Sequence, residues 1–86
     1  MQPIQELLQR IQWDPHFGAG AFTIGYFDRR DQRVVRVPFQ QIRMETGKHF
    51  SFDLEDRYGN VRMVPFHRVR EVWRDDKLIW QRTPDA

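Results

Sequence analysis

The sequence contains no cysteine, and its apolar residues never form a long uninterrupted run. The lack of cysteine excludes both a disulfide framework and a thiolate metal site. No stretch approaches the roughly 20 apolar residues that a membrane-spanning helix needs. The first residues also lack the basic start and apolar run of a secretory signal. We therefore expect a cytoplasmic protein that does not contact a membrane.

The sequence also lacks the motifs of the common enzyme classes. Its three histidines, His16, His49 and His67, are too widely spaced to form a local metal site. The single serine, Ser51, stands within a predicted strand and has no glycine elbow to activate it. No glycine-rich loop precedes a predicted helix, so a phosphate loop is missing as well. We expect no metal, no cofactor and no catalytic residue.

Aromatic residues and arginine, in contrast, are plentiful. The 86 residues include seven Phe, three Trp and two Tyr, which suffices for the core of a single domain over residues 1–86. Of the 14 basic residues, 12 are arginine, although the formal net charge is only +2. Arginine presents a planar fork of donors that matches phosphate oxygens better than lysine does. The composition therefore favours an anionic partner.

A short amphipathic helix is predicted at the start of the chain. Apolar residues recur there at helical spacing, and Pro3 suits the first helical position. The helix should cover residues 3–13 and end at the Asp-Pro pair that follows, because a residue before proline avoids the helical conformation. The periodicity of the helix and of the later strands assigns six residues to the core: Ile4, Leu7, Phe52, Leu54, Val64 and Trp80.

From residue 22 onward, apolar and polar residues alternate as half-buried strands require. The alternation predicts two hairpins, over residues 22–37 and 50–64, and a C-terminal hairpin over residues 69–81. Residues 34–43 align with residues 61–70, and in both copies a Pro-Phe pair ends the second strand, so the two hairpins are duplicates. We predict an α+β fold, with one N-terminal helix packed on a curled, mostly antiparallel sheet or a small barrel of six to seven short strands.

Two short segments carry the side chains best suited to binding or catalysis. They lie at the end of the first strand and after the second Pro-Phe pair, and they contain Tyr26, Asp28, Arg29, His67, Arg68 and Arg70. The first copy of the repeat has glutamine at both positions where the second has His67 and Arg68. Only one half of the duplicated scaffold therefore carries cationic or titratable side chains at this place, which suggests specialisation.

These residues allow several interpretations. In the simplest, His67 caps a turn and Arg68 forms an ordinary surface ion pair with an acid such as Asp28. A phosphoesterase or RNase could use His67 with Arg68 and Asp28, but one histidine leaves the second proton transfer unassigned. A protein-interaction or regulatory domain would use an exposed sheet edge instead. If the residues form a site for an anionic ligand, we expect Arg33 to lie away from that site.

Three motifs occur together in this chain: Trp-Asp-Pro at 13–15, Ile-Gly-Tyr at 24–26 and His-Arg-Val-Arg at 67–70. With them, the sequence from about Pro3 to Arg82 resembles the RNA cyclic group end recognition domain. One departure is Asp76, where the final turn of the family often has glycine. The resemblance implies a non-catalytic module that binds RNA ends with a 2′,3′-cyclic or related terminal phosphate. It also implies a partnership with an RNA repair or processing enzyme.

The resemblance further implies roles for the candidate residues. Four side chains would donate to phosphate oxygens: Arg29, Arg68, Arg70 and His67. Tyr26 or Trp13 would stack on the terminal base. Asp28 would orient an arginine or accept a hydrogen bond from a ribose hydroxyl.

Overall fold

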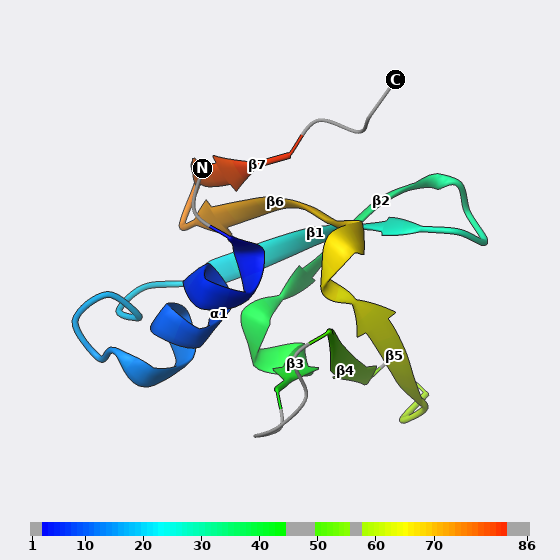
Figure 1. The fold of residues 1–86 in the computed structure, drawn as a ribbon, viewed down its shortest axis with the longest axis horizontal. Helices are drawn as coiled ribbons and strands as arrows, with labels where there is room; N and C mark the ends of the chain where they lie inside the picture. The colour runs from blue at the N-terminus through cyan, green and yellow to red at the C-terminus, as the bar shows by residue number, and fades with distance from the viewer. Residues whose placement is uncertain (1–2, 45–49, 56–57, 83–86) are drawn as a thin grey trace.

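A computed structural model describes residues 3–44, 50–55 and 58–82 of the chain. Within these residues one α-helix precedes seven strands and two short 3-10 helices (Figure 1). In chain order they are α1 (Ile4–Trp13), β1 (Phe22–Asp28), β2 (Arg33–Pro38), η1 (Phe39–Gln41), β3 (Ile42–Arg43), β4 (Ser51–Glu55), β5 (Val61–Pro65), η2 (Phe66–Arg68), β6 (Val69–Arg74) and β7 (Lys77–Gln81). The predicted α+β class is confirmed.

The described strands form two antiparallel sheets instead of a closed barrel. The first sheet has the order β2-β1-β6-β7, and the second has the order β3-β4-β5. Irregularities in register between Gly25 and Tyr26 and between Val72 and Trp73 interrupt the pairing of β6 with its neighbours. Such bulges increase the local twist of a sheet. The alternative of a small barrel is therefore wrong, whereas the curled sheet is confirmed.

The helix α1 forms where the sequence predicted it and buries one side. Its apolar residues Ile4, Leu7, Leu8 and Ile11 are all buried. Pro3 is the N-cap, with extended φ and ψ of −60° and 140°, and its carbonyl accepts the first helical hydrogen bond from the Leu7 N–H at 3.2 Å. The prediction that Pro3 occupies the first helical position is wrong by one residue, because its ψ is not helical. Among the described residues, no helix is long and apolar enough to cross a membrane.

The two copies of the repeated unit exchange their third strands. Each copy is a hairpin, β1–β2 or β4–β5, followed by a 3-10 turn and another strand. The third strand of the first copy, β3, pairs with β4, and the third strand of the second copy, β6, pairs with β1. The pair Ile42–Leu54 therefore has its counterpart in Val69–Tyr26. This exchange relates the copies by a pseudo-twofold axis and holds the two sheets together.

A single cluster of buried apolar residues joins α1 to both sheets, and Figure 1 shows α1 in front of the four-stranded sheet with the three-stranded sheet below it. Every residue predicted for the core belongs to this cluster: Ile4, Leu7, Phe52, Leu54, Val64 and Trp80. Directly after the proline of each Pro-Phe pair, at residues 39–41 and 66–68, the chain makes only a 3-10 turn. The turn between β6 and β7 places Asp75 at a φ of 52°, a conformation that aspartate tolerates.

Candidate functional site

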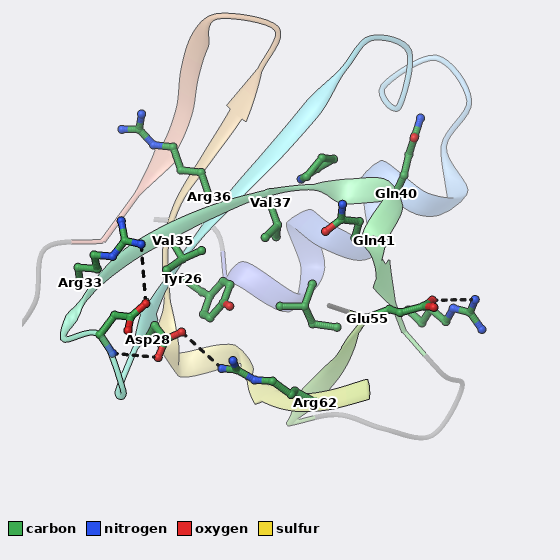
Figure 2. A pocket seen from close by; sticks show the side chains of 14 residues that line it. Tyr26, Asp28, Arg33, Val35, Arg36, Val37, Gln40, Gln41, Glu55 and Arg62 are labelled. Atoms are coloured by element: carbon green, nitrogen blue, oxygen red, sulfur yellow. Dashed lines mark hydrogen bonds and ion pairs between the residues drawn. The ribbon is translucent and has the colours of Figure 1, made fainter. Parts of the chain in front are cut away.

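A groove of about 680 Å³ lies between β2 of the first sheet and the strands β4 and β5 of the second (Figure 2). Tyr26 and Leu54 contribute from the two central strands. The charged side chains that line the groove are four arginines and three carboxylates: Arg33, Arg36, Arg43, Arg62, Asp28, Asp31 and Glu55. The groove therefore has an excess of one positive charge and many directional donors.

The pleat of the strands directs three of these charged side chains, Asp28, Arg33 and Arg62, toward the groove. Arg62 shares a face with the buried Val64, two residues further along β5, and Asp28 shares a face with Tyr26. Arg33 likewise stands opposite Asp28 across the β1–β2 pair. The same alternation in the sequence could have identified Arg33 and Arg62 as inward-facing, but neither was among the candidates. The expectation that Arg33 lies away from Tyr26 and Asp28 is wrong.

Asp28 is the most buried charged residue of the groove, with 6% of its surface exposed. One carboxylate oxygen, Oδ1, accepts hydrogen bonds from the backbone N–H groups of Arg30 at 2.8 Å and Asp31 at 3.4 Å. The other, Oδ2, lies 3.6 Å from Nη2 of Arg62. Burial alone would raise the pKa of Asp28, but these hydrogen bonds and the charge of Arg62 outweigh it and lower the pKa. The carboxylate therefore stays charged and pairs with Arg62 rather than with Arg68.

Tyr26 lies at the centre of the groove, beside Arg62 (Figure 2). Only 4% of its surface is exposed, so the ring offers no free face on which a base could stack. Burial raises the pKa of Tyr26, although the charge of Arg62 acts in the opposite direction. The phenol is therefore neutral at physiological pH, and its hydroxyl can donate a hydrogen bond into the groove.

Two further arginines of the groove are held only loosely. Arg33 Nη2 lies 3.7 Å from Asp31 Oδ2, and Arg43 Nη2 lies 3.5 Å from Glu55 Oε2. The side chains of Arg33 and Arg43 are 69% and 76% exposed, whereas that of Arg62, in its pair with the buried Asp28, is 32% exposed. Exposed pairs of this kind contribute little to stability, so an incoming anion can compete with the carboxylates for these arginines.

Of the seven residues that the sequence marked as candidates, Tyr26 and Asp28 line this groove. The remaining candidates do not line it: Trp13, Arg29, His67, Arg68 and Arg70. Trp13 is 71% exposed at the end of α1, and Arg29 is exposed in the β1–β2 turn. The fold thus divides the candidate residues among several places.

The His-Arg-Val-Arg motif surrounds η2 and the start of β6. His67 is exposed, and its backbone carbonyl accepts a hydrogen bond from Nη1 of Arg70 at 2.6 Å. Because His67 does not line the groove that holds Asp28, the arrangement does not support the histidine–aspartate pair of a phosphoesterase. Among the described residues, no three histidine or acidic side chains could hold a metal ion, and His49 lies outside the described residues.

Together, fold and groove define a small α+β domain with an arginine-lined groove that is suited to an anionic ligand. The chain belongs to the family described as the MJ1316 RNA cyclic group end recognition domain, whose model matches residues 1–82. The resemblance that the motifs indicated is thereby confirmed. The name of the family describes recognition of RNA ends that carry a cyclic group, which is a binding role. No solved structure was found to match the chain.

Proposed function

We propose that this protein is a non-catalytic module that binds, in the groove between its sheets, a single-stranded RNA end with a 2′,3′-cyclic or other terminal phosphate. The observation that supports this proposal is that Tyr26 and Arg62 line the same groove, where Asp28 forms an ion pair with Arg62. The family to which the chain belongs is named for the same class of ligand.

The recognition would depend on geometry more than on net charge. A cyclic phosphate has two free oxygens, and the guanidinium of Arg62 can bind both with parallel N–H donors. The neutral hydroxyl of Tyr26 adds a third donor. Because Asp28 orients Arg62 before the ligand arrives, less side-chain entropy is lost on binding. A terminal diol carries no charge and would gain none of these charge-assisted bonds.

Binding without catalysis fits the composition of the groove. None of the described residues that line it is a histidine, and the carboxylate of Asp28 already accepts two backbone hydrogen bonds. The described lining thus offers no histidine, the side chain that most often takes up and returns protons during catalysis. We further propose that the module acts in the cytoplasm beside a separate RNA repair or processing enzyme, which performs the chemistry at the recognised end.

The proposal is tested by titrating the protein with a labelled RNA pentamer that ends in a 2′,3′-cyclic phosphate, a 3′-phosphate or a diol. We expect the phosphate-bearing ends to bind at least about tenfold more tightly, the effect of a positioned charge-assisted hydrogen bond. Arg62→Lys keeps the charge but loses the fork of donors, so it should remove most of this preference. Arg10→Gln on α1 is the matched control: it removes a charge away from the groove and should leave the preference intact.

Three results would count against the proposal. Cleavage of the RNA in the same samples would show catalysis. Loss of the preference in Arg68→Ala or His67→Ala, with Arg62→Lys unaffected, would place the site at η2 instead. Equal affinity for all three ends would remove end recognition altogether and favour a protein partner at the edge strand β5, where Val61 and Met63 are 63% and 66% exposed. Thermal unfolding of each variant checks that the fold is intact.

A further inference from the structure

A second hollow, of about 440 Å³, lies on the opposite face of the four-stranded sheet. Its apolar part is formed by Phe27 and Val34, which are paired across β1 and β2. These two residues alternate with Tyr26 and Val35, so they point away from the groove. Val34 is 39% exposed, and Phe27 is half-buried. The hollow therefore offers an accessible apolar surface that the core does not use.

Two cations are fixed beside this surface. Arg70 and Arg82 both line the hollow, and both donate from Nη1 to the carbonyl oxygen of His67, at 2.6 Å and 2.9 Å. The guanidinium of Arg70 lies 5.8 Å from the centroid of the Phe27 ring. An aromatic ring with two neighbouring cations matches a nucleotide, which has a flat base and a negatively charged phosphate.

Arg33 connects the second hollow with the groove, because its side chain lines both. It belongs to β2, the edge strand of the four-stranded sheet. An RNA strand whose end occupies the groove can therefore pass over this edge at Arg33 and reach the outer face. Its backbone would meet a positive charge at the point of crossing.

We propose that the outer hollow binds the nucleotide that precedes the RNA end, with its base against Phe27 and Val34 and its phosphate on Arg70 and Arg82. This inference rests on the proposed function, since it assumes that the terminal phosphate occupies the groove. It also implies that full affinity needs two nucleotides, which the protein binds on the two sides of the edge strand β2.

The experiment compares a nucleoside 2′,3′-cyclic phosphate with two dinucleotides that end in the same group, one of them lacking its first base. The complete dinucleotide should bind at least about fivefold more tightly than either of the other two, as expected for stacking of one base on an aromatic ring. Phe27→Leu keeps an apolar side chain but removes the ring, so it should abolish the gain over the dinucleotide that lacks its first base, without changing the affinity for the mononucleotide. Arg82→Gln should reduce the gain over the mononucleotide, and Lys77→Gln at the exposed start of β7 is the control that should not.

The outcomes separate this inference from the proposed function. If neither ligand binds better with a cyclic phosphate than with a diol, the proposed function fails. If the cyclic phosphate is preferred but the first base adds nothing, the outer hollow is not a nucleotide site. A gain that persists in both Phe27→Leu and Arg82→Gln would also overturn the inference. Should Phe27→Leu fail to fold, Arg82→Gln against Lys77→Gln decides the matter alone.

Discussion

Gly25 stands in β1 opposite Glu71 of β6, and the space above it is already filled. A Cβ at this position would lie 2.4 Å from Cγ and 2.7 Å from Oε1 of Glu71. Glu71 cannot easily move aside, because its Oε1 contacts Nε of Arg36 at 2.5 Å. Gly25 is not among the residues with positive φ, so glycine is needed here for space and not for backbone conformation.

Gly25→Ala should therefore destabilise the protein by about 1–3 kcal/mol, the usual cost of overpacking. For a chain of this size, each kcal/mol lowers Tm by about 4–8 °C, so Tm should fall by about 4–24 °C. The assay is thermal unfolding of Gly25→Ala, Glu71→Ala and the double variant. In the Glu71→Ala background the clash is absent, and the alanine should be neutral or stabilise by up to about 1 kcal/mol, since glycine is unfavourable within a strand. An equal loss of Tm in both backgrounds would refute the reasoning.

Two further predictions concern stability. Leu7 is 3% exposed in the core, so Leu7→Ala should lower the free energy of unfolding by about 2–5 kcal/mol in a denaturant titration; a change within error would contradict its core position. Burial acts to raise the pKa of Asp28 and of Glu71, but hydrogen bonds and neighbouring arginines lower both on balance. Such groups stabilise the fold above their unfolded pKa, so stability should decline as the pH falls below about 4.5 and through the lower folded pKa values. Asp28→Asn should flatten this decline in acid unfolding curves, whereas an unchanged curve would count against the assigned contacts.

Much of the fold could be predicted because it depends on local pattern. The helical spacing before residue 13 and the alternation after residue 22 fix which elements form, and Asp75 and the Pro-Phe pairs fix where strands end. The pairing of β6 with β1 and of β3 with β4 could not be derived in this way. β1 and β6 are distant in sequence, and β3 has only two residues, so neither pairing follows from a local pattern. The same exchange explains why two sheets form where a closed barrel was also possible.

The lining of the groove was predicted only in part, for a related reason. Tyr26 and Asp28 belong to one strand and could be found together, whereas Arg33 and Arg62 belong to strands of different sheets. Only the fold brings those two arginines to one groove. In the sequence, Arg62 stands between Val61 and Met63, which are both exposed. Its inward direction is apparent only because it lies two residues from the buried Val64, on the same face of β5.

The duplication itself explains why Tyr26 and Arg62 come together in the groove. By the pseudo-twofold relation, Tyr26 corresponds to Leu54, and Arg62 corresponds to Val35. All four residues line the groove, and Tyr26 pairs with Val35 in one sheet as Leu54 pairs with Arg62 in the other. Each sheet thus contributes one polar and one apolar side chain, and the polar ones lie close enough for Arg62 to affect the pKa of Tyr26. A phosphate bound between them would contact both sheets, so neither copy of the repeat could form this site by itself.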